Sequence, residues 1–180
     1  MGLKNVIAFF PRKTRKKSFS EWHTDCSIYR YKKERNEMIG FFDFDMTTGI
    51  TKGKETPSLS QFKNPEFASQ DILNAKPTTI TKKVMNRYSK VFILTARNAG
   101  KNNEMRNAMK RYFMQNGIYI PNNQILMLGD YMKDRKTAEK KAIVLNRMTQ
   151  HFGQTVDFWD DDNDNVRYAK CLDRVRTFQV

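Results

Sequence analysis

Two aspartates stand two residues apart at the end of an apolar run, in the stretch MIGFFDFDMT (38–47). Alternate side chains of an extended strand point to the same face, so we expect Asp43 and Asp45 to lie side by side where the strand ends. Such a pair can divide the work of a hydrolytic reaction, one carboxylate attacking as a nucleophile and the other moving a proton. The same pair could also be no more than the point at which a strand meets solvent, and the other strand ends help to decide.

Polar and acidic residues follow three further apolar runs. The cluster DDDNDN (160–165) follows TVDFW (155–159), Thr95 stands in ILTARN (93–98), and Asp130 stands in LGDY (128–131). Carboxylates brought together from two strand ends repel one another unless a cation neutralises them, and Mg²⁺ is the hard divalent ion that best suits oxygen ligands. A solvated loop and a calcium site are the alternatives for residues 157–164. Asp130 is either an ordinary loop carboxylate or a contact to a substrate or cap.

Alternating apolar and helical segments must position these residues. The runs at 38–42, 90–94, 124–128 and 155–159 are short and continuous, which is typical of buried strands in a parallel sheet. Helical patterns at 78–88, 102–117 and 136–152 separate them, and one short helix is expected near 65–75 inside a polar insert at about 48–77. Strands separated by helices predict an α/β fold with a mainly parallel sheet, in which function collects beyond the carboxyl ends of the strands.

The strand ends together resemble the motifs of the haloacid dehalogenase (HAD) superfamily of phosphohydrolases, over about residues 38–170. DFDMT (43–47) resembles its DxDxT motif, ILT (93–95) its strand ending in Ser or Thr, and DDDNDN its DDxxxN form, with Asp160, Asp161 and Asn165. LTAR (94–97) also resembles the corresponding segment of small polynucleotide-end phosphatases and RNA-repair proteins. The resemblance implies a Rossmann-like three-layer α/β/α sandwich. Residues 48–94 are too few for a large helical cap, so a small or absent cap is expected.

The resemblance also implies roles for single residues. Asp43 would be the nucleophile that forms an aspartyl-phosphate, and Asp45 would protonate the leaving oxygen and then activate water. Thr95 would hydrogen-bond the transferring phosphoryl group. Thr47 would brace the loop at the substrate, and Arg97 would contact the substrate itself.

The same resemblance implies a Mg²⁺ site. Asp43, Asp160 and Asp161 would hold the ion together with the backbone carbonyl of Asp45. Three consecutive aspartates leave the choice of pair open, so Asp161 and Asp162 are the alternative.

The family also needs a lysine beside the nucleophile, and the candidates are Lys133, Lys136, Lys140 and Lys141. The helix at 136–152 has an apolar stripe that includes Leu145, and the position four residues before Leu145 is Lys141. A lysine on a buried stripe needs a buried partner, which the acidic site would supply. Lys140 is expected to point toward solvent. Lys141 is therefore the first choice and Lys136 the second, and the alternative is that Lys140 and Lys141 both lie on the surface.

The 180-residue chain carries a net charge of +14, unevenly distributed. Residues 1–36 hold ten Lys/Arg and three acids, so this basic N-terminal arm supplies +7, while residues 37–180 would form the phosphatase domain. Basic residues interleaved with aromatics can follow a phosphate backbone and stack on bases, although a solvated arm is the alternative. The charge and the open site favour a nucleic-acid terminal phosphate, such as a 3′-phosphate, as substrate. A nucleotide monophosphatase and a non-catalytic nucleic-acid-binding protein are the alternatives.

Cysteine usage and hydropathy bear on location. Cys26 and Cys171 match no disulfide framework or zinc spacing, as expected in a reducing cytoplasm. No apolar run approaches the roughly 20 residues of a membrane-spanning helix. The first basic cluster follows the first apolar run, the reverse of a secretory signal. We therefore expect a cytoplasmic protein with no membrane partner.

Overall fold

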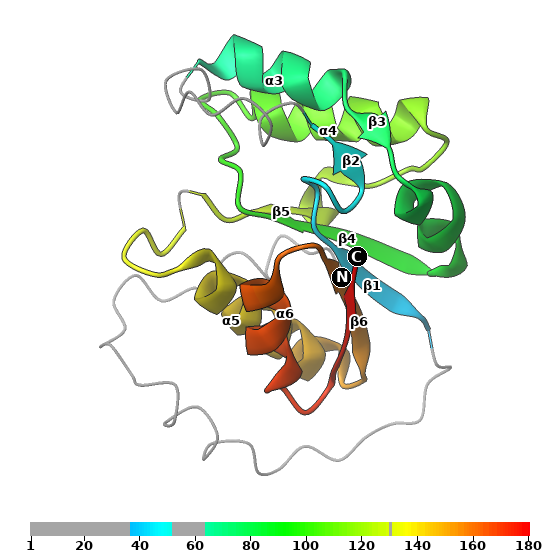
Figure 1. Cartoon of the computed structure of the whole chain (residues 1–180), viewed down its shortest axis with the longest axis vertical. Coiled ribbons are helices and arrows are strands. Elements are labelled where there is room, and N and C mark those ends of the chain that lie inside the picture. Colours follow the sequence, from blue (N-terminus) through cyan, green and yellow to red (C-terminus); the bar gives the residue numbers. More distant parts are fainter. Residues whose placement is uncertain (1–36, 52–63, 130) are drawn as a thin grey trace. The chain divides into compact units, whose positions relative to one another are not determined.

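The computed structural model describes residues 37–51, 64–129 and 131–180, and a five-stranded parallel sheet lies at their centre (Figure 1). The basic arm predicted for residues 1–36 lies outside the described residues. The sheet has the order β5-β4-β1-β6-β7. Its strands are β1 (Ile39–Phe42), β4 (Lys90–Thr95), β5 (Ile125–Met127), β6 (Val156–Asp160) and β7 (Val175–Gln179). The α/β fold with a parallel sheet that the sequence predicts is confirmed.

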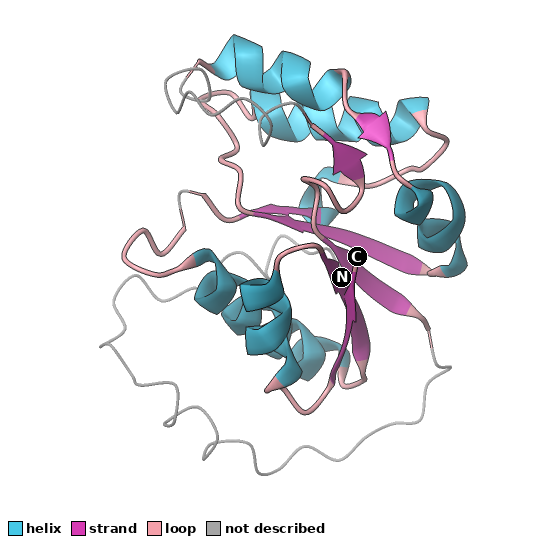
Figure 2. Ribbon diagram, in the orientation of Figure 1, coloured by secondary structure: helices cyan, strands magenta, loops and turns pink. Residues whose placement is uncertain are grey.

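Helices cover both faces of this sheet (Figure 2). The helices α3 (Pro65–Leu73) and α4 (Glu104–Gln115) pack together on one face. The helices α5 (Thr137–Phe152) and α6 (Asn163–Lys170) pack together on the other face. This layering is consistent with a Rossmann-like fold. Within the described ranges, none of the helices has both the length and the apolar character that crossing a membrane requires.

The order in which successive strands are added across the sheet reverses beside β1. From β1 the chain moves to β4 and then to β5, and α5 brings it back to β6 on the opposite side of β1. The neighbours β1 and β6 therefore begin connections that run to opposite faces of the sheet. In open parallel sheets such a switch point leaves a crevice at the carboxyl ends of the two strands, where ligands bind.

Aromatic residues of β1 fill both layers of the core, which explains why the strand reads as a continuous apolar run. Phe41 stacks on Phe92 of β4, with ring centroids 4.7 Å apart, on the face that α5 covers. Phe42 belongs to the cluster on the other face, where Phe44 meets the ring of Tyr112 of α4 edge-on at 5.2 Å. Because both faces are buried, apolar side chains are favoured throughout the strand before Asp43.

Local signals set the ends of α3 and α4. Asn64 caps α3 by accepting hydrogen bonds from the backbone N–H of Glu66 and Phe67, and a proline follows it in the first turn. Just after the C-terminal end of α4, Gly117 has φ +76°. The N–H of Ile118 donates to the carbonyl of Phe113 at 2.9 Å, which completes a glycine-terminated helix end.

Most predicted segments agree with the structure to within two residues, but one is wrong and several elements were missed. Residues 78–88 form no regular α-helix; a π-helical segment (Ile80–Val84) precedes a 3₁₀ turn (Met85–Arg87). The reason lies in Thr78 and Thr81, whose hydroxyls donate to backbone carbonyls of the loop after β1. The missed elements are α6, β7 and the antiparallel pair β2 (Gly49–Ile50) and β3 (Lys76–Pro77).

Candidate active site

The loop after β1 is held in one conformation by side-chain hydroxyls. The strand ends at Phe42, and Met46 has φ +62°, a left-handed backbone that costs about 1 kcal/mol or more in a residue other than glycine. The hydroxyl of Thr48 donates to the carbonyl of Asp43 at 2.9 Å. The hydroxyl of Tyr112 donates to the carbonyl of Thr48 at 2.8 Å, so α4 supports the same loop. These bonds fix the backbone that carries Asp43.

A buried lysine joins the ends of β1 and β6. The ammonium group of Lys141 on α5 donates to Asp43 Oδ1 and to Asp160 Oδ2, each at 2.7 Å. The Lys141 side chain is only 2% exposed and that of Asp160 is fully buried. The acidic partner that the apolar stripe predicts for Lys141 is therefore present in the structure.

Burial and crowding set the charge balance of this group. Burial raises the pKa of Asp43 to about 7, and Lys141 opposes the rise while Asp160 adds to it. Burial also works against the ammonium charge, but Asp43 and Asp160 together raise the pKa of Lys141 above its ordinary value. One lysine therefore does not neutralise the carboxylates around it.

The three consecutive aspartates that begin at the last residue of β6 have different roles in the structure. Asp160 accepts hydrogen bonds from the side-chain amide of Asn165, at 3.1 Å to both oxygens, and from the N–H of Asp162 at 2.9 Å. Asp161 accepts a hydrogen bond from the hydroxyl of Thr47 at 3.3 Å. Asp162 is exposed and caps α6, accepting from the N–H of Asp164 and of Asn165. The N-cap role of Asp162 favours Asp160 and Asp161 over the alternative pair.

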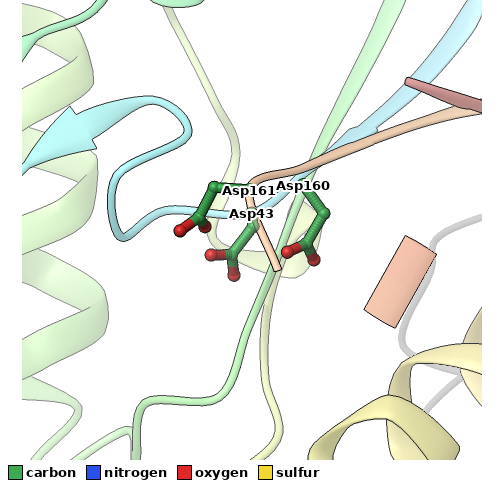
Figure 3. Close-up of side chains that lie close together, drawn as sticks. All are labelled: Asp43, Asp160 and Asp161. Carbon is green, nitrogen blue, oxygen red and sulfur yellow. The ribbon is translucent and has the colours of Figure 1, made fainter. Parts of the chain in front are cut away.

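A cluster of three carboxylates could hold a metal ion here. Asp43, Asp160 and Asp161 each offer an oxygen, and these oxygens lie within 4.8 Å of one another (Figure 3). With Lys141 the group carries a formal charge of −2, which a divalent cation would neutralise. Asp45 contributes no side chain to this cluster.

Variants of the adjacent aspartates separate capping from cation binding. We expect Asp162→Ala to lower the free energy of unfolding by about 1 kcal/mol, because α6 loses its N-cap, and to leave the affinity for Mg²⁺ unchanged. Asp161→Asn is expected to weaken Mg²⁺ binding at least tenfold with little effect on stability. Calorimetric Mg²⁺ titration and thermal unfolding of both variants measure the two effects. Weaker Mg²⁺ binding in Asp162→Ala as well as in Asp161→Asn would restore the alternative pair.

Arg97 connects the half-buried Asp45 to the buried carboxylate of Asp71 on α3. Its Nε donates to Asp45 Oδ2 at 2.9 Å, and its Nη2 donates to Asp45 Oδ1 at 2.7 Å. The same Nη2 donates to Asp71 Oδ2 at 2.7 Å. The hydroxyl of Thr51 also donates to Asp45 Oδ1, at 2.7 Å. A direct contact between Arg97 and a substrate stays a prediction.

The two threonines singled out in the sequence are both fully buried. Thr95 ends β4, and its hydroxyl accepts a hydrogen bond from the N–H of Arg97 at 3.2 Å. Thr47 directs its hydroxyl to Asp161, at the edge of the carboxylate cluster. Their predicted contacts to a phosphoryl group and to a substrate stay predictions.

The prediction that Lys140 points toward solvent is wrong. Lys140 is only 8% exposed, and its ammonium group donates to the carbonyl of Leu128 at 3.2 Å. The loop after β5 lies over this part of α5 and buries a side chain that helical spacing alone would leave on the surface. Lys136, the second choice for the motif lysine, is exposed at the N-cap position of α5. Asp130 lies outside the described residues.

The buried carboxylate of Asp71 carries a signal that can be read in the sequence. Asp71 was missed, although it lies three residues after Ala68 and one before Ile72, on the buried side of α3. A charged residue on an apolar stripe is the same signal that singled out Lys141.

A comparison with models of known protein families found no match to this chain, and a comparison with curated protein sequences found none either. The likeness to the HAD superfamily therefore depends on the residues of the strand ends. The geometry of those residues is the basis on which a function can be proposed.

Proposed function

We propose that this chain is a Mg²⁺-dependent phosphohydrolase of the HAD type that acts through an aspartyl-phosphate at Asp43, on the terminal phosphate of a nucleic acid. One observation carries the proposal: Asp43 lies at the switch point of the sheet, 2.7 Å from the buried ammonium group of Lys141 and within one cluster with Asp160 and Asp161. Phosphoryl transfer depends mainly on such positioning and on neutralisation of charge.

Charge balance supports the choice of a metal-dependent reaction. Asp43, Asp160, Asp161 and Lys141 sum to −2, and a phosphate monoester would add further negative charge. Mg²⁺ held by these three carboxylates, with the carbonyl of Asp45 as the HAD resemblance implies, would neutralise both. A metal-free site of this composition would repel its own substrate.

The two aspartates of the DxD segment divide the reaction. Asp43 attacks phosphorus, the bond from phosphorus to the ester oxygen breaks, and protonated Asp45 gives its proton to the departing oxygen. Asp45 then takes a proton from water as the water oxygen attacks the phosphorus of the aspartyl-phosphate. Inorganic phosphate leaves, Asp43 is restored as a carboxylate, and Asp45 is protonated again for the next turnover.

The nucleic-acid part of the proposal depends on charge and on the size of the insert. The net charge of +14 favours a polyanion over a small monoester. The segment between β1 and β4 is too short for a large cap, and its described parts are the β2–β3 pair, α3 and the helical turns before β4. A site with a small cap admits a bulky substrate end.

A substrate panel tests this proposal. Phosphate release is measured with Mg²⁺ on 3′-phosphorylated and 5′-phosphorylated oligonucleotides, mononucleotides and an aryl phosphate, with Asp43→Asn as the matched control. We expect Mg²⁺-dependent release with the highest kcat/KM on an oligonucleotide end. Preference for mononucleotides would replace the polynucleotide substrate with a nucleotide. No release from any substrate, together with salt-sensitive binding of DNA or RNA, would establish the non-catalytic alternative.

A further inference from the structure

The carboxylate of Asp71 shares the guanidinium group of Arg97 with Asp45, the proposed acid/base group. Its side chain is 3% exposed and accepts a hydrogen bond from Arg97 Nη2 at 2.7 Å. A buried carboxylate is costly unless it is paired, so this contact holds both groups in place. Asp71 belongs to α3, which packs against α4 in the core, so the backbone of the insert sets its position.

Arg97, which is held by Asp71, in turn holds the carboxylate of Asp45. Its Nε and Nη2 donate to the two oxygens of Asp45, a paired geometry that fixes the plane of the carboxylate as well as its distance. The guanidinium carbon lies 5.8 Å from the centre of the Phe44 ring, and Nη1 donates to the carbonyl of Ala68 at 3.4 Å. The orientation of Asp45 is therefore determined by a group that is itself held from α3.

We propose that Asp71 is a positioning residue: by holding Arg97 it fixes the carboxyl group of Asp45 in the direction from which it protonates the leaving oxygen. This inference rests on the proposed phosphohydrolase function. The inference gives the insert between β1 and β4 a second role besides packing on the sheet. Through Asp71 and Arg97, the position of α3 would affect proton transfer by Asp45.

Protonation of the leaving group has a specific kinetic signature. It matters greatly for a poor leaving group such as phenol or a nucleoside hydroxyl, and little for 4-nitrophenol, which departs without a proton. The ratio kcat/KM includes the steps up to departure of the leaving group and excludes hydrolysis of the aspartyl-phosphate, which is common to all substrates. If Asp45 is misoriented, the fall in kcat/KM therefore depends on the leaving group. General loosening of the site would instead lower kcat/KM for all substrates alike.

The test compares phenyl phosphate with 4-nitrophenyl phosphate in Asp71→Asn, an isosteric change that removes the charge. We expect kcat/KM to fall about 10- to 100-fold on phenyl phosphate, as is typical when a group that orients a site residue is lost, and less than about threefold on 4-nitrophenyl phosphate. Gln70→Ala, an exposed neighbour on the same helix, is the matched control and should leave both values unchanged.

A second variant keeps the test decisive if Asp71→Asn fails to fold. Arg97→Lys keeps the charge but cannot hold two carboxylates with a planar fork, so it should show the same dependence on the leaving group. Where both fold, Asp71→Asn should add less than twofold to Arg97→Lys, because its effect passes through Arg97. Equal losses on both substrates, or independent effects of the two changes, would overturn the inference. An inactive wild-type protein would instead refute the proposed function, and the inference with it.

Discussion

Asp43→Asn is expected to abolish phosphate release, with kcat/KM falling on the order of 10⁴- to 10⁶-fold, as is typical when a nucleophile is removed. The amide has nearly the same shape as the carboxylate but cannot attack phosphorus. Phosphate release from the best substrate of the panel, measured at saturating Mg²⁺, gives the size of the loss.

The same substitution should leave the fold intact. Asp43 is a buried carboxyl whose pKa is raised to about 7, so the cost of its ionisation to folding develops as the pH rises from its ordinary pKa to about 7 and is fully present at pH 8. Removing this charge is therefore expected to leave the thermal midpoint at pH 8 unchanged or to raise it. Asp173→Asn, in an exposed turn outside the site, is the control and should keep full activity. Substantial activity in Asp43→Asn would mean that another group attacks phosphorus.

Lys141→Met is expected to destabilise the protein by about 3–5 kcal/mol, because it leaves the buried carboxylates of Asp43 and Asp160 without their shared cation. Mg²⁺ should restore part of this loss, since a bound cation supplies the missing positive charge. Thermal unfolding of the variant and the wild type, each with and without Mg²⁺, measures both effects. Activity should fall with the loss of charge beside the nucleophile.

The neighbouring lysine provides a matched control. Lys140 is also buried, but its ammonium group donates to the backbone carbonyl of Leu128. Lys140→Met should cost about 1 kcal/mol, the usual value of one hydrogen bond, and its midpoint should respond to Mg²⁺ as the wild type does. The assigned geometry would be contradicted if Lys141→Met were as stable as the wild type. It would also be contradicted if Mg²⁺ raised the thermal midpoint of Lys141→Met by no more than it raises that of the wild type.

The pattern of apolar residues in the sequence predicted the strands and the helix face that are buried in the core. Strands covered on both faces read as short apolar runs, and the stripe through Leu145 placed Lys141 on the side of α5 that faces the sheet. The same reasoning failed for Lys140, because a loop that arrives from β5 buries it. Helical spacing describes one helix, whereas burial depends on everything packed around it.

Elements that depend on tertiary contacts escaped sequence reasoning. The threonines at 78 and 81 bond to the loop after β1, and this distorts a segment that reads as helical. The strand β7 (VRTFQ) lies at the edge of the sheet, mixes apolar with polar residues and lacks the continuous apolar run that marked the inner strands. Asp71 carried a readable signal, a charge on an apolar stripe, but its partner Arg97 lies 26 positions away in the chain.

The aspartyl-phosphate at Asp43 is the central claim, and chemical trapping tests it most directly. The protein is mixed with Mg²⁺ and a substrate, quenched in acid during turnover, and reduced with borohydride, which converts an acyl phosphate of aspartate to homoserine. Peptide mass spectrometry then locates the modified residue. We expect homoserine at position 43, dependent on substrate and on Mg²⁺. Turnover with aspartate unchanged at position 43, or with homoserine at another aspartate, would contradict it.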